Sequence, residues 1–229
     1  MIYEGIHINW LWHSSFLIKA SFGKIYIDPF KIPDSYAEDI DKEAEVIFIT
    51  HSHYDHCSIE DIKKIVKHGT IIICPADVSS KFSKIDKKLD IKIAEPGTTM
   101  EFFDSDLRFW TIPAYNNSGR FHSREDEWNG YVIQADGVKI YHAGDCDLIN
   151  EMKTLLNMAV DIALLPVGGT FTMNAGEAAK AASIIKPRLA IPMHWGTIQN
   201  TGDKKEAELF LKYCSSYDIN AKILEIEAG

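Results

Sequence analysis

The stretch VIFITHSHYDHC, residues 46–57, is the most informative part of this sequence. VIFIT is a short apolar run typical of a buried strand, and the residues after it place His51, His53, Asp55 and His56 within six positions. Imidazole nitrogen and carboxylate oxygen are ligands that zinc and related metals accept, and strand ends are where α/β proteins usually present a site. His51 and His53 point to the same side of an extended stretch and can reach one ion, whereas the following turn directs Asp55 and His56 to a second. The alternative, surface histidines without a ligand, is disfavoured by this clustering.

The sequence around this stretch predicts alternating strands and helices. Strands are expected at residues 6–12, 15–20, 24–28, 46–49, 71–74, 100–104, 108–114, 130–135, 139–143, 162–168, 188–193 and 221–226. Helices are expected from Ser58 to His68 and after the capping residues Asn174 and Asp203, and Asp136-Gly137 predicts a hairpin turn.

This order predicts an α/β fold, a four-layer αββα sandwich in which two mixed β-sheets pack face to face with helices outside. No Pro/Gly/Ser-rich linker divides the chain, so residues 1–229 are expected to form a single domain.

Composition narrows the choice of partner. A formal net charge of -9 disfavours nucleic-acid binding, and no apolar run approaches the length of a bilayer span, so we expect a small-molecule substrate and no membrane partner. The four cysteines are widely spaced, and the N-terminus lacks the pattern of a secretory signal. A cytoplasmic protein with reduced thiols is therefore expected, and a homo-oligomer is left open.

Several motifs together resemble a known family. HSHYDH (51–56) is similar to the HxHxDH signature of the metallo-β-lactamase superfamily. WLWHSSFLI (10–18) and IYIDPF (25–30) resemble the WLGH and DP segments of the branch that contains the ascorbate-6-phosphate lactonases and N-acylphosphatidylethanolamine phospholipase D, although Trp12 stands where glycine is usual. YHAGDCD (141–147) and IPMHWG (191–196) resemble the superfamily's later aspartate and histidine motifs.

The resemblance implies a metallo-β-lactamase fold and a dinuclear metal site. It implies that the first metal is held by His51 and His53, that the second is held by Asp55, His56 and His194, and that Asp145 bridges the two. Zinc is the default for these ligands, whereas manganese, iron or nickel stays open.

One histidine that the family usually has after the strand 108–114 is missing, because Tyr115 and Asn116 stand there. His122 could fold back and complete the first site, and the alternative is water together with Asn116.

The resemblance further implies a metal-dependent hydrolase. Two divalent cations lower the pKa of a shared water to about 7, and the resulting hydroxide attacks the substrate. Asp55 would hold this nucleophile or accept its proton, and His13 would orient a ligand or protonate the leaving group.

The substrate is expected to be a small, anionic ester, lactone or phosphodiester. Arg120 could bind its anion, with Tyr115 and Asn116 beside it, whereas the alternative is a solvated arginine on a polar loop. Two other functions stay open: a small nuclease or phosphodiesterase acting on RNA or DNA, and a metal-binding member of the fold without turnover. Cys57 and Cys146 flank predicted ligands, and we expect small buried thiols there rather than metal donors.

Overall fold

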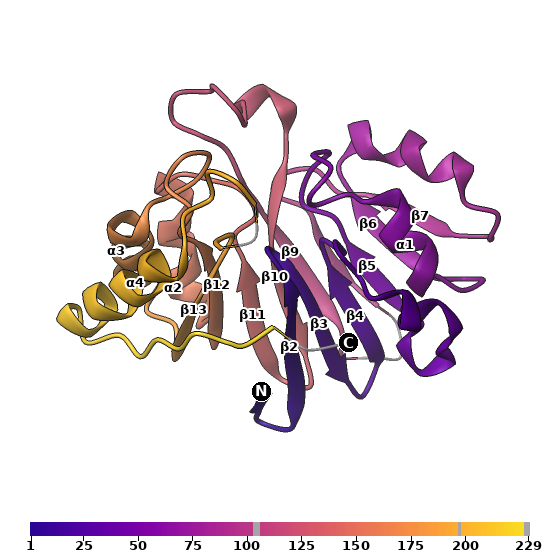
Figure 1. Cartoon of the computed structure of the whole chain (residues 1–229), viewed down its shortest axis with the longest axis horizontal. Coiled ribbons are helices and arrows are strands. Elements are labelled where there is room, and N and C mark those ends of the chain that lie inside the picture. The colour runs from indigo at the N-terminus through magenta and orange to yellow at the C-terminus, as the bar shows by residue number, and fades with distance from the viewer. Residues whose placement is uncertain (103–105, 197, 227–229) are drawn as a thin grey trace. The chain divides into compact units, whose positions relative to one another are not determined.

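The computed structural model describes residues 1–102, 106–196 and 198–226 (Figure 1). The chain divides into two compact units, residues 1–95 with 225–229, and residues 96–224. Each unit contains one β-sheet. The expectation that residues 1–229 form a single domain stays a prediction.

The first unit has a seven-stranded mixed sheet in the order β1 to β7. Its strands are β1 (Ile2–Tyr3), β2 (Ile6–Trp12), β3 (Ser15–Ala20), β4 (Gly23–Ile27), β5 (Val46–Phe48), β6 (Ile71–Cys74) and β7 (Asp90–Ile93). Neighbours from β1 to β4 are antiparallel, and those from β4 to β7 are parallel. The helix α1 (Ile59–Ile65) connects β5 to β6, and 3-10 helices span Asp34–Glu38, Ile40–Lys42 and Ala76–Lys84.

The apolar face of α1 packs onto this sheet. Ser58 caps the helix by accepting a hydrogen bond from the Asp61 amide at 3.3 Å, as its sequence predicts. Ile62 and Ile65 then point into a buried cluster that includes Tyr26 and Ile47 from the central strands. The buried residues of these strands are apolar, and polar groups of the motif lie in the loops that follow them.

The second unit has a six-stranded mixed sheet in the order β13-β12-β11-β10-β9-β8. Its strands are β8 (Thr99–Glu101), β9 (Arg108–Pro113), β10 (Asn129–Ala135), β11 (Val138–His142), β12 (Ile162–Pro166) and β13 (Leu189–Met193). Neighbours from β8 to β11 are antiparallel, and those from β11 to β13 are parallel. Its helices are α2 (Leu155–Met158), α3 (Ala175–Ile185) and α4 (Lys204–Ser216), with 3-10 helices at Arg124–Asp126 and Asn150–Thr154.

Local sequence signals explain the turns and helix starts of this unit. Asp136 and Gly137 have φ of 49° and 77°, which is the positive pair that a two-residue hairpin between β10 and β11 requires. Asn174 and Glu177 form a reciprocal capping box at the start of α3. Alanines bury one face of α3, and α4 lies beside it (Figure 1).

The predicted α/β class with two mixed sheets and helices is confirmed. The predicted strand at 221–226 is wrong, because Ala221 and Ile226 form isolated bridges only, to Ala190 and Trp10. The strand predicted at 100–104 lies in β8 as far as Glu101, and its residues 103 and 104 fall outside the described residues. Within the described ranges, no helix combines the length and the apolar character needed to cross a bilayer.

Candidate metal centre

In the first unit, strand direction brings the motif residues to one edge of the sheet. Ile27 of β4 pairs in parallel with Phe48 of β5, so the loops after both strands leave the sheet at the same edge. Asp28 follows β4, and the histidine motif follows β5. The hairpin between the antiparallel strands β2 and β3 turns at His13.

A buried carboxylate orients the ligand loop. Asp28 is fully buried, and its Oδ1 accepts a hydrogen bond from the Thr50 amide at 2.8 Å. Its Oδ2 accepts from the Thr50 hydroxyl at 2.7 Å and lies 2.7 Å from His56 Nδ1. A carboxylate on one ring nitrogen fixes the orientation of the imidazole and leaves Nε2 as the donor for a metal. The IDPF segment was noted in the sequence, but no role was predicted for Asp28.

The first two histidines of the motif converge. His51 Nε2 lies 3.1 Å from His53 Nδ1, and His51 Nδ1 lies 2.9 Å from the Thr50 hydroxyl oxygen. The Thr50 hydroxyl therefore contacts both Asp28 and His51. This arrangement brings two imidazole donors together, as the sequence predicts.

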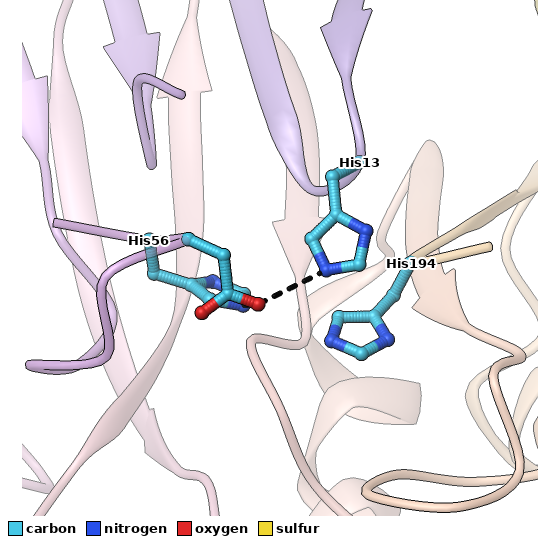
Figure 2. Close-up of side chains that lie close together, drawn as sticks. His13, His56 and His194 are labelled. Atoms are coloured by element: carbon cyan, nitrogen blue, oxygen red, sulfur yellow. Dashed lines mark ion pairs between the residues drawn. The ribbon is translucent and has the colours of Figure 1, made fainter. Parts of the chain in front are cut away.

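His13 lies among the potential ligands of this unit. Its backbone has a φ of 51°, the β2–β3 pairing shifts register between Trp10 and Trp12, and Trp10 Nε1 donates to the His13 carbonyl at 2.8 Å. His13 Nε2 lies 3.3 Å from Asp55 Oδ2, an ion pair drawn as a dashed line in Figure 2. His56 Nε2 lies 3.9 Å from the same oxygen, and ligand atoms of these three side chains all lie within 4.8 Å of one another. The sequence predicted a proton donor or orienting group at His13, and the structure adds a potential ligand.

The second unit repeats this arrangement at its own sheet edge. Leu164 of β12 pairs in parallel with β11, and Met193 of β13 pairs in parallel with β12, so the three strands end together. Asp145 follows β11, and His194, with a φ of 59°, follows β13. Gly168, after β12, allows close packing because a Cβ there would lie 2.8 Å from the His194 carbonyl oxygen.

Two histidines meet Asp145 in the second unit. His194 Nε2 lies 3.0 Å from Asp145 Oδ2, and His122 Nε2 lies 3.4 Å from the same oxygen. All three side chains are buried. His122 Nδ1 lies 2.9 Å from Asn116 Oδ1, and this contact leaves Nε2 on the side of Asp145. The loop thus folds back and brings His122 to Asp145, one of the ligands that the resemblance implies.

Residues predicted to bind substrate make contacts within this unit. The Asn116 amide nitrogen donates to Asp147 Oδ1 at 3.0 Å and to the Phe171 carbonyl at 2.9 Å. The Tyr115 hydroxyl donates to Glu151 Oε2 at 3.0 Å, and burial together with this hydrogen bond raises the pKa of Tyr115.

The two arginines of this loop also have neighbours. Arg124 pairs with Glu151 at 3.1 Å, whereas Arg120 is exposed and its guanidinium lies 4.9 Å from the ring centre of Phe121. Of the two, Arg120 is the more available to an anionic ligand.

The donor set fits a divalent metal within each unit. Ligand atoms at 2.0–2.1 Å from one ion are about 3.3 Å apart in tetrahedral geometry and about 3.0 Å apart in octahedral geometry. The His51–His53, His122–Asp145 and His194–Asp145 atom pairs are separated by 3.1, 3.4 and 3.0 Å. These separations match what ligands of a shared ion require.

The cysteines do not have the character of metal donors. Cys57 and Cys146 are free and buried. Burial raises the pKa of Cys57 to about 12, and burial also raises the pKa of Cys146 well above its usual value. Burial thus favours the protonated thiol in both, and among the described residues neither cysteine belongs to a group of converging potential ligands.

Comparisons with known proteins find similar sequences. A family model described as "Beta-lactamase superfamily domain" matches residues 7–194. A "UPF0173 metal-dependent hydrolase" of Thermococcus onnurineus is 36% identical over 197 residues, covering 84% of this chain and 85% of the relative.

Two solved structures are similar over nearly the whole chain. A putative metal-dependent hydrolase from Parabacteroides distasonis has a TM-score of 0.80 at 28% identity and covers 97% of this chain and 94% of its own. Igni18, a metallo hydrolase from Ignicoccus hospitalis, has a TM-score of 0.77 at 25% identity and covers 96% of this chain and 95% of its own.

Proposed function

This chain belongs to the β-lactamase superfamily, within which it is a UPF0173 metal-dependent hydrolase, and we propose that it cleaves a small anionic ester, lactone or phosphodiester with two zinc ions. That it is a metal-dependent hydrolase follows from its family. The substrate class, the identity of the metal and the number of ions are our proposal. The WLWH and IDPF segments further support a place near the ascorbate-6-phosphate lactonases.

We propose that the metal ligands are the residues that the sequence resemblance implies, together with His122. The proposed ligands are His51, His53, Asp55 and His56 from the first unit and His122, Asp145 and His194 from the second. The observation that carries this proposal is that His122 and His194 each place Nε2 within 3.4 Å of Asp145 Oδ2. His122 thereby takes the role of the histidine that is missing at Tyr115-Asn116.

The proposed chemistry divides roles among the side chains of the first unit. When bound, divalent cations lower the pKa of a coordinated water toward 7 and polarise the substrate oxygen. Asp55 Oδ2, left free of metal, would take the proton that the attacking water releases, because this oxygen faces His13. His13 Nε2, 3.3 Å away, carries that proton to the leaving group. Asp28 and Thr50 keep the His56 and His51 rings in place while the proton moves.

Two residues of the second unit support the proposal in different ways. Asn116 acts as a positioning residue, because its Oδ1 accepts from the His122 amide at 3.1 Å and contacts His122 Nδ1. Arg120 is proposed to attract the substrate anion, with Tyr115 nearby in the same loop, since its exposed guanidinium faces solvent.

We further propose a cytoplasmic protein with a small-molecule substrate, acting without a membrane or nucleic-acid partner. The free, buried cysteines and the net charge of -9 support this proposal. A homo-oligomer is compatible with it.

Metal content measured by elemental analysis tests the proposal, using protein purified without chelator or histidine tag. We expect about two ions per chain in the wild type, about one in His122→Ala and fewer in His51→Ala. Asn116→Ala should lower occupancy partially, in the same direction as His122→Ala. His68→Ala is the matched control, because His68 is exposed and outside the proposed ligands.

Hydrolysis of bis(4-nitrophenyl) phosphate and of a γ-lactone by the same preparations completes the test. Turnover that follows metal content across the variants supports the proposal. Full metal content without turnover on either substrate class would leave a metal-binding protein and contradict the proposed substrates. A wild type that binds neither zinc nor manganese would overturn the proposed centre.

A further inference from the structure

A cavity of about 660 Å³ lies in the first unit beside the ligand loop. Tyr54, between His53 and Asp55 in the motif, forms part of its wall, and Phe30 forms another part. The Phe30 ring meets the Tyr54 ring edge to face, with centroids 5.9 Å apart, and meets the His13 ring in the same manner at 6.4 Å. Phe30 therefore connects the cavity directly to His13, and Tyr54 connects it to the residues on either side.

The wall between the charged groups is apolar. It is formed by Phe30, Ile32, Pro33, Tyr54 and Ile59. The Tyr54 side of the cavity is open, because Tyr54 is 66% exposed despite its large ring. A volume of this size is typical of small-molecule sites, where apolar walls bind the body of a ligand.

The charged groups of the cavity largely neutralise one another. Lys64 Nζ lies 2.8 Å from Asp34 and 3.1 Å from Asp61, and it donates to the Ile32 carbonyl at 2.7 Å. Asp61 also accepts from the backbone amides of Lys31 and Ile32. Lys64 and Asp61 are thus occupied by protein contacts that a ligand would have to displace.

The sign of the charge argues against an ionic group deep in the cavity. Three carboxylates and two ammonium groups line it: Asp34, Glu60, Asp61, Lys31 and Lys64. A substrate anion would meet the excess of carboxylates, and a cation would have to compete with Lys31 and Lys64 for them. Lys31 also stands 5.9 Å from the centre of the Phe30 ring. An uncharged group is the one that this lining admits at least cost.

We infer that the cavity binds an uncharged apolar arm of the substrate, aryl or alkyl, and that Phe30 and Tyr54 determine this specificity. The inference rests on the proposed hydrolase and adds to it the second half of the substrate, beside the anionic reacting group. An aryl arm gains most, since its ring can meet Phe30 and Tyr54 edge to face.

Calorimetric titration of the metal-containing protein with acetate, hexanoate and 4-phenylbutanoate tests the inference, because all three share a carboxylate and differ in the arm. We expect 4-phenylbutanoate to bind at least about tenfold more tightly than acetate. Tyr54→Ala should remove most of this gain and leave acetate affinity within about twofold, whereas Tyr54→Phe should retain it. Ile59→Trp, which fills the cavity, should also remove it.

Tyr213→Ala is the matched control, because Tyr213 is an exposed tyrosine of α4 that does not line the cavity. Metal content is measured for each variant, so that a damaged ligand loop is recognised separately from a damaged cavity. Equal affinities for the three carboxylates would overturn the inference. Tighter binding of a trimethylammonium carboxylate of matched length would overturn the assignment of an uncharged arm.

The uncharged alcohol 4-phenyl-1-butanol separates this inference from the proposed function. Its binding requires the cavity and no metal, and it should weaken in Tyr54→Ala but not in Tyr213→Ala. Such binding in a protein without metal or turnover would overturn the proposed function and support the cavity. Turnover without binding of the alcohol would support the proposed function and overturn the inference about the cavity.

Discussion

Replacing Asp28 by asparagine tests whether a buried carboxylate prepares His56 for metal binding. The substitution keeps the shape of the side chain and exchanges one oxygen for an NH2 group. In the wild type, Oδ2 lies 2.7 Å from both the Thr50 hydroxyl and His56 Nδ1, and Oδ1 accepts from the Thr50 amide at 2.8 Å. An asparagine that keeps the Oδ1 contact presents donor hydrogens to the hydroxyl and to His56 Nδ1.

The magnitude follows from the tautomer of His56. His56 Nδ1 can accept from the new NH2 group only if the ring proton moves to Nε2, and a protonated Nε2 cannot bind a metal. Loss of such a partner typically lowers metal affinity by about 10–100-fold, which corresponds to about 1.4–2.7 kcal/mol. Removing a buried hydrogen bond to a charged group also costs about 1.5–3 kcal/mol of folding stability.

The assay is competition for zinc between the protein and a chromophoric chelator, together with the Tm of metal-free and metal-loaded protein. Asp34→Asn is the control, because its side chain is 98% exposed and its carboxylate contacts Lys64 rather than a histidine. We expect zinc affinity to fall at least about tenfold in Asp28→Asn and to stay unchanged in the control. Zinc affinity of Asp28→Asn within about twofold of the wild type would refute this reasoning.

Three further predictions concern thiol chemistry, close packing and pH. Burial raises the pKa of Cys57 to about 12, so iodoacetamide should alkylate this thiol slowly at pH 8 until urea unfolds the chain. The stabilisation from its protonated form should be lost as pH rises toward 12. Rapid alkylation of the folded protein would contradict this prediction. Gly168→Ala brings a Cβ to 2.8 Å from the His194 carbonyl oxygen and should lower both Tm, by several degrees, and metal content, whereas an unchanged Tm with full metal content would count against the close approach. The hydrogen bond and charge of Lys64 hold the pKa of Asp34 below its usual value of 3.8, so NMR titration should show a higher Asp34 pKa in Lys64→Met. The stabilisation from this ion pair should be lost as pH falls below 3.8. An unchanged Asp34 pKa in Lys64→Met would refute the pairing.

Local patterns made much of the fold predictable. The two helices that begin after Asn174 and Asp203 are capped by these residues, and the Asp136-Gly137 turn connects β10 to β11 as expected. Such signals act over a few residues, so the sequence displays them directly. The helix predicted for 58–68 ends at Ile65, because the backbone of Val66 is extended. This end was not predicted, since no nearby sequence signal marks it.

Features set by distant contacts were not predictable. Strand β7 was not predicted, because its four residues are polar or exposed and only its pairing with β6 makes it a strand. The opposite error occurred at 221–226, where the apolar pattern predicts a strand but only isolated bridges form.

The site shows the same division between local and distant information. The motif after β5 was recognised because its ligands are adjacent in sequence. The contact between Asp28 and His56 joins residues 28 positions apart, and neither residue alone indicates it. Likewise, the ion pair of His13 with Asp55 depends on a bulged hairpin whose geometry the sequence does not display.

The loop between Asn116 and His122 has a consequence for motif searches. The Asn116 amide donates to the His122 carbonyl at 2.8 Å, and the His122 amide donates back to Asn116 Oδ1, so the two positions face each other across the loop. The side chains at the two positions therefore lie side by side. A motif search that expects a histidine directly after β9 would miss the imidazole that reaches the same place from His122.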